Sequence, residues 1–181
     1  MIRNTLKCFG SVTKLLHWLI FILIIAQFYF VWSINHDSPL ASRYIMLHKS
    51  VGFTILLLGI LFFIWHIINI KPFPPVTQPR WQYITSKAVH HTLFILIMLM
   101  PIVGYLLICA DGKSIDFFGW FIIPCLISKN DYLGGIMFST HQTIAYLILI
   151  LVGIHFLAAL YHHFICKDNV LKRMLPFTSC E

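Results

Sequence analysis

Histidines are the residues of this sequence whose type and spacing most clearly suggest chemistry. The last apolar stretch begins at His141, has His155 in its interior and ends with His162 and His163. At about 100° per residue on a helix, His155 lies ~40° and His162 ~60° from His141, so these three share one face. Along the helix axis, His141 and His155 are ~21 Å apart. Because imidazoles in hydrocarbon are costly and usually functional, this stretch is predicted to hold two ligands at two depths.

The composition is that of a membrane protein. Hydrophobic residues make up 59% of the chain and charged residues only 10%. Four apolar stretches are each long enough to cross a bilayer, which takes about 20 helical residues. They run approximately over Leu15–Ile34, Ile45–Ile68, Ala88–Cys109 and His141–Phe164. The sequence therefore predicts one all-α domain over residues 1–181, a four-transmembrane-helix bundle.

Basic residues gather on one side of these stretches. They precede the first stretch, lie between the second and third, and follow the fourth: Arg3, Lys7, Lys14, Lys71, Arg80, Lys87, Lys167, Lys172 and Arg173. The other side has fewer, namely Arg43, Lys49, Lys113 and Lys129, offset by aspartates. The positive-inside rule then predicts that both termini are cytoplasmic. The net charge of +7 reflects this topology, and no aromatic-interleaved basic patch predicts nucleic-acid binding.

This topology sorts four histidines by depth. The first stretch starts inside, so His17 lies near the cytoplasmic face; the fourth starts outside, so His155 lies in the cytoplasmic half. The second stretch also starts outside, which places His48 at the depth of His141. Two pairs are predicted, His17 with His155 and His48 with His141.

Two histidines from facing helices are what a six-coordinate haem iron requires, and helix bundles build cofactor sites in this way. The sequence has no CxxCH motif, so each haem b would be bound without covalent attachment. With both axial positions filled, the expected chemistry is one-electron transfer. Two such haems, one in each leaflet, would form a path for electrons across the membrane.

Four other interpretations compete with this one. Zinc usually takes four ligands, and the histidine pairs have no neighbouring carboxylate or thiolate within the stretches. A proton-coupled or cation-coupled transporter would usually carry an acidic residue inside a span, and none is present. A carrier of a non-haem metal, or a four-helix scaffold with chance histidines, remains open, although the matching depths favour paired ligands.

The connections between the apolar stretches also carry predictions. The segment Lys71–Trp81 is rich in proline and is expected to be an extended cytoplasmic linker. The outer connection, residues 110–140, contains an apolar run, DFFGWFIIPCLI, that is too short to span. It is expected to lie on the outer membrane surface or to dock a periplasmic partner. Cys109 and Cys125 could form a disulfide there, but packing thiols are the preferred interpretation.

Three motifs give the chain a family resemblance. They are LLHW at the start of the first stretch, MLHKSVG in the second, and GIHFLAALYHHFICKDNVLKRMLP at the end of the fourth. With these motifs the chain resembles the bacterial cytochrome b561 family, four-helix dihaem proteins of the inner membrane, over essentially its whole length. The family's four haem ligands fall on His17, His48, His141 and His155, with the same pairing that the depth argument predicts.

The resemblance also implies a reaction, the oxidation of superoxide at the periplasmic face and the reduction of ubiquinone in the membrane. Arg43, Lys49 and Lys113 are then expected to attract the superoxide anion. His90 and His162 are the candidates for quinone contact and proton supply near the cytoplasmic haem, with His163 and Lys87 as reserves. The alternative function is an electron relay between the quinone pool and a periplasmic redox partner docked on residues 111–140.

Overall fold

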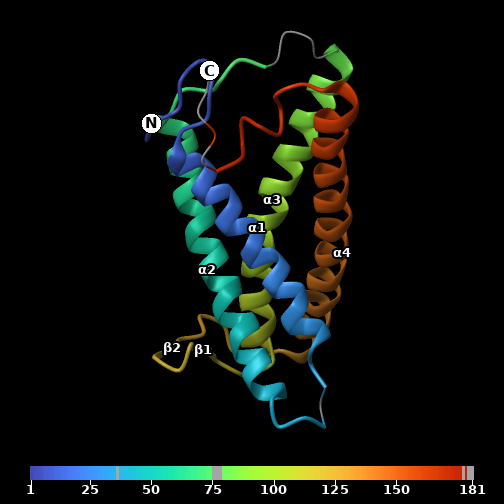
Figure 1. The fold of residues 1–181 in the computed structure, drawn as a ribbon. Coiled ribbons are helices and arrows are strands. Elements are labelled where there is room, and N and C mark those ends of the chain that lie inside the picture. Colours follow the sequence, from blue (N-terminus) through green and yellow to red (C-terminus); the bar gives the residue numbers. More distant parts are fainter. Residues whose placement is uncertain (36, 75–78, 177, 179–181) are drawn as a thin grey trace.

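Four long helices form the bundle (Figure 1). The computed structural model describes residues 1–35, 37–74, 79–176 and 178. The helices are α1 (Ser11–Trp32), α2 (Ala41–Ile68), α3 (Arg80–Ala110) and α4 (Asp131–Tyr161), and α4 continues into a π-helical turn, η1 (His162–Cys166). All four are long and apolar enough to cross a membrane. The prediction of a four-helix membrane bundle is confirmed.

The helices begin before the apolar stretches that predict them. Helix α3 starts at Arg80, directly after Pro79, and α4 starts at Asp131 rather than His141. The side chain of Asn130 accepts a hydrogen bond from the backbone N–H of Leu133 at 3.0 Å, which caps α4. The polar first turn of a helix can extend beyond the hydrocarbon of the membrane. The length of the apolar stretch alone therefore underestimates the length of the helix. The linker predicted over Lys71–Trp81 therefore ends at Pro79, and its residues 75–78 lie outside the described residues.

The bundle has a core at mid-height and an apolar exterior. The buried core is formed by branched aliphatic side chains from all four helices: Ile20, Ile24, Val51, Ile55, Val103, Ile144 and Ile148. Many other large apolar side chains of the helices face outward, as lipid-facing residues do. Helix α1 packs mainly on α2, and α3 packs mainly on α4. Within this bundle, histidines on different helices can approach one another.

A β-hairpin occupies the outer connection. Strand β1 (Ile115–Phe117) pairs antiparallel with β2 (Phe121–Ile123). The turn between them passes through Phe118 and Gly119, both at positive φ (53° and 77°). The short interfacial segment that was expected here is thus this hairpin, which lies beside the end of α2 (Figure 1). A disulfide joins Cys109 to Cys125, so the interpretation of these two cysteines as packing thiols is wrong.

The bundle has two distinct ends, named here the hairpin end and the terminal end (Figure 1). At the terminal end the segment that follows α4 folds back onto the N-terminal part of the chain. Arg173 Nη2 donates to Lys7 O at 2.6 Å, Trp18 Nε1 donates to Met174 O at 2.8 Å, and Lys14 Nζ donates to Thr178 O at 3.0 Å. Burial in this contact lowers the pKa of the Arg173 guanidinium. The N-terminal segment and the segment after α4 therefore lie on the same side of the bundle.

Candidate functional site

The first predicted histidine pair lies toward the hairpin end. His48 of α2 and His141 of α4 face each other with their ring centroids 6.0 Å apart and their planes at 79°. Helix α3 approaches this pair through Gly104, where a Cβ would lie only 3.0 Å from His141 Cε1. A side chain at this position would therefore displace the imidazole by a few tenths of an ångström.

The second predicted pair lies toward the terminal end. His17 of α1 and His155 of α4 have ring centroids 6.1 Å apart, with planes at 61°. A third imidazole, from His90 of α3, lies edge-on to His155 at 5.0 Å. The Nδ1 atom of His90 lies 2.6 Å from Ser86 O in the preceding helical turn, an interaction that fixes its ring orientation. The structure therefore brings both predicted pairs together and adds His90 to the second.

The donor set fits a metal held between two imidazoles. An imidazole nitrogen lies about 2 Å from a bound metal, so two rings that share one metal have their centroids roughly 6 Å apart. Both pairs show this spacing. The Nδ1 atoms of His17, His48 and His141 are buried and have no hydrogen-bond partner within the described part of the chain. Ring nitrogens without a partner are available to a metal, so these side chains suit the role of haem-iron ligands.

A cavity of about 640 Å³ opens at the hairpin end, between α2, the end of α3 and the start of the hairpin. Its polar lining includes all three predicted cationic residues together with one carboxylate: Arg43, Lys49, Lys113 and Asp116. Lys113 also lies 3.2 Å from Asp111 in an exposed ion pair that solvent screens strongly. The lining has more positive than negative charge and is suited to attract a small anion.

Ser50 connects this cavity to the adjacent histidine pair, and the sequence analysis did not identify it. Its side chain is 0% exposed; its Oγ lies 3.1 Å from Asp116 O and accepts a hydrogen bond from Phe118 N at 2.9 Å. Ser50 follows His48 by only two residues. The same turn of α2 therefore carries the imidazole of the pair and the hydroxyl that is hydrogen-bonded to the hairpin. A hydroxyl inside an apolar stretch was the only signal for this role in the sequence.

Gln27 is a second residue that the sequence analysis missed. Its Nε2 donates to His48 O at 3.0 Å, and a Cβ at Gly52 would lie 3.0 Å from the same nitrogen. Gln27 Oε1 is buried and without a partner among the described residues. This amide, in the last third of α1, links α1 to the turn of α2 that carries His48. An uncharged polar residue deep in a span was the available signal.

The remaining predicted residues lie at the terminal end, in separate surroundings. His162 Nδ1 lies 2.5 Å from Asp168 Oδ2, and both side chains are largely buried. Lys87 Nζ lies over the Tyr83 ring at 4.5 Å from its centroid. His163 is half-buried, and its Nδ1 is buried without a partner within the described residues. Among the residues predicted to contact quinone or supply protons, His90 differs from these three because its ring contacts a paired histidine, His155.

The comparisons with known proteins agree with this architecture. The family model for prokaryotic cytochrome b561 matches residues 9–177. The chain is 30% identical to cytochrome b561 homolog 2 of Escherichia coli, over 98% of this chain and 96% of that protein. It is 31% identical to the probable superoxide oxidase CybB of Yersinia pestis, over 89% of this chain and 92% of that protein. The chain therefore belongs to the prokaryotic cytochrome b561 family, b-type haem proteins that transfer electrons in the bacterial inner membrane.

Proposed function

We propose that this protein binds two haems b, oxidises superoxide at the hairpin end and reduces ubiquinone near the terminal end. The observation that carries the proposal is the combination of two histidine pairs at two levels of one bundle with a cation-lined cavity beside one of them. The positive-inside rule supports an orientation in which the hairpin end faces the periplasm.

In this proposal His48 and His141 hold one haem, and His17 and His155 hold the other. A haem held by such a pair would supply one-electron transfer. The protein side chains set the levels of the two sites, because His141 and His155 are ~21 Å apart along α4. Gly104 and Gln27 maintain the hairpin-end pair by leaving room beside His141 and by binding the backbone at His48.

The cavity is proposed to collect the electron donor. Arg43, Lys49 and Lys113 give it an excess of positive charge, which raises the local concentration of an anion such as superoxide. Each superoxide gives up one electron and leaves as oxygen. The name of the Yersinia relative, probable superoxide oxidase, supports this choice of donor.

The acceptor is proposed to be ubiquinone, near the His17–His155 pair. Two electrons and two protons convert one ubiquinone into ubiquinol, so the site needs groups that hold protons. His90 lies beside His155, and His162 lies against the carboxylate of Asp168. We assign quinone contact to His90 and proton supply to His162, with His163 and Lys87 as the neighbouring reserves.

The test uses the purified haem-loaded protein in detergent with a short-chain ubiquinone and an enzymatic source of superoxide. Quinol should form in proportion to the superoxide supplied, and added superoxide dismutase should abolish its formation. Quinol formation that persists in the presence of dismutase, or no quinol formation by protein with a full haem content, would contradict the proposal.

A second function rests on a different observation, the exposed apolar surface of the outer connection. Trp120, Ile122 and Leu126 are 77%, 65% and 84% exposed. Such side chains suit either the membrane surface or a periplasmic redox partner docked on residues 111–140. Inactivity toward superoxide, together with a haem-containing or iron–sulfur protein that co-purifies and reduces the bound haems, would favour the electron relay.

A further inference from the structure

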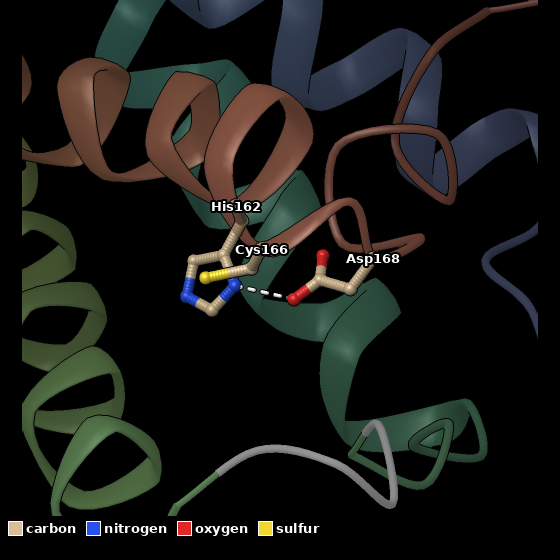
Figure 2. A group of neighbouring side chains, drawn as sticks. All are labelled: His162, Cys166 and Asp168. Carbon is tan, nitrogen blue, oxygen red and sulfur yellow. Dashed lines mark hydrogen bonds and ion pairs between the residues drawn. The ribbon is translucent and has the colours of Figure 1, made fainter.

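A cluster of three metal-ligating side chains lies at the terminal end, apart from both histidine pairs. His162, Cys166 and Asp168 each offer one donor atom, and these atoms all lie within 4.8 Å of one another (Figure 2). They comprise an imidazole, a thiol and a carboxylate, the three side-chain types that bind zinc in proteins. We propose that this cluster, named here the HCD cluster, is a binding site for Zn²⁺.

The backbone that forms the cluster is unusual at two points. Residues His162–Cys166 form a π-helical turn, which is rare and frequently found at functional sites. The next residue, Lys167, adopts the left-handed conformation at φ 53°, although it is not a glycine. This reversal turns the chain so that Asp168 N donates to His162 O at 3.2 Å. The two departures together bring the carboxylate back to the imidazole and the thiol.

The side chains are placed as a zinc site requires. His162 Nδ1 and Asp168 Oδ2 lie 2.5 Å apart, so both donor atoms are already side by side where an ion can take the place of the shared proton. The side chains of His162 and Asp168 are only 12% and 13% exposed, whereas Cys166 is exposed and gives the ion a route of entry. Donor atoms around a tetrahedral zinc ion lie roughly 3–4 Å apart, so small side-chain rotations suffice to bring these three onto one ion. The fourth position is then open to water.

Binding follows simple proton chemistry. The Cys166 thiol loses its proton to solvent and binds as thiolate, and any proton held between His162 and Asp168 is released as the ion replaces it. The proton supply proposed above for His162 therefore belongs to the zinc-free protein. No oxidant or reductant is needed. Cys166 is a free, exposed thiol and is therefore available to a metal ion.

Zinc binding is measured on the haem-loaded protein in detergent, so that the paired histidines are occupied. After treatment with a chelator, the protein is titrated with Zn²⁺ in competition with a chromophoric chelator. One high-affinity zinc ion per chain is expected, and His162→Gln or Cys166→Ser should weaken it by about tenfold or more. The matched control is His163→Gln, which removes the neighbouring imidazole and should leave the affinity unchanged. Equal affinity in the parent protein and Cys166→Ser would overturn the proposal.

A second measurement uses the parent protein and therefore does not depend on the folding of any variant. The rate at which a maleimide labels Cys166 is followed by peptide mass spectrometry, with and without Zn²⁺. Zinc should slow this labelling at least severalfold, and an unchanged rate under saturating zinc would overturn the proposal. Both measurements read metal occupancy rather than electron transfer. Their failure would therefore leave the proposed oxidation of superoxide and reduction of quinone untouched.

Discussion

The two ends of the bundle use the same pair of imidazoles in different surroundings. The ring spacing is nearly identical, 6.0 Å for His48–His141 and 6.1 Å for His17–His155. At the hairpin end, the pair lies near a cavity lined with cationic side chains. The hairpin there is hydrogen-bonded to Ser50, and the segment after it is joined to α3 by the Cys109–Cys125 disulfide. The terminal end instead adds His90 beside the pair. The imidazole pairs are thus common to both ends, and in the proposed function the surroundings of each pair select the electron donor or the electron acceptor.

The largest expected effect comes from removing one histidine pair at a time, which tests whether the two ends bind haem independently. His141→Ala should abolish haem binding at the hairpin end and leave the other site filled, and His155→Ala should do the reverse, because each residue belongs to one pair only. Haem content, measured on the purified variants as the pyridine haemochrome, should fall to about half in both cases. Absorption and redox titration then identify which haem remains.

The control for this experiment is His66→Ala. His66 is an exposed histidine of α2, on the same helix as His48, and it should be dispensable for both haems. Loss of both haems from every single variant, in protein that retains its helical circular dichroism, would contradict two independent sites.

Charge at the hairpin end gives the next largest effect. Lys49→Gln and Lys113→Gln each remove one positive charge from the cavity and should lower the rate of superoxide oxidation by about tenfold at low ionic strength. The loss should shrink as salt is added, because salt screens the attraction. Stopped-flow measurement of haem reduction by superoxide provides the rate.

The matched control is Lys129→Gln. Lys129 lies on the same outer connection but pairs with Asp131 at 3.3 Å, and both side chains are largely exposed. Its loss should change the rate little. If all three lysine variants slow the reaction equally, the cavity is not the entry site and only the overall charge of this end matters.

Much of the comparison between the ends was predictable from the sequence. The helical period and the charge asymmetry predicted the depths of four histidines, because helix geometry converts residue number directly into height: His17, His48, His141 and His155. The ring spacings agree with the predicted pairing. Whether these four residues bind haem stays a prediction.

The surroundings of the pairs were less predictable, for physical reasons. The apolar run DFFGWFIIPCLI favours no single structure by itself, and its hairpin is hydrogen-bonded to Ser50, which is distant in sequence. The Cys109–Cys125 disulfide depends on the same fold-back of the chain. The contact of His90 with His155 arises from the packing of α3 on α4, which residue spacing within one helix does not reveal.

Ser50→Ala tests whether the hairpin holds the cavity in place. The change leaves Phe118 N without its acceptor at a partly buried position, which should lower the free energy of unfolding by about 1 kcal/mol. The hairpin carries part of the cavity lining, so superoxide oxidation should slow a few-fold while haem content stays full. The control is Thr54→Ala, whose hydroxyl bonds only to Ser50 O within the helix. If Ser50→Ala lowers haem content as well, the serine supports His48 rather than the hairpin alone.

The smallest expected effect comes from a change beside a single imidazole, that of His141, which should distinguish the haem of the hairpin end from that of the terminal end. Gly104→Ala would place a methyl group 3.0 Å from His141 Cε1, so the ring must tilt by a few tenths of an ångström. A rotated axial ligand should shift the reduction potential and the absorption bands of the hairpin-end haem and leave the terminal-end haem unchanged, because α3 makes this approach at His141. Gly135→Ala is the control, since nothing lies within 4 Å of a Cβ at Gly135. A shift of both haems by Gly104→Ala would mean that α3 moves as a whole and that the two ends are mechanically coupled through the bundle.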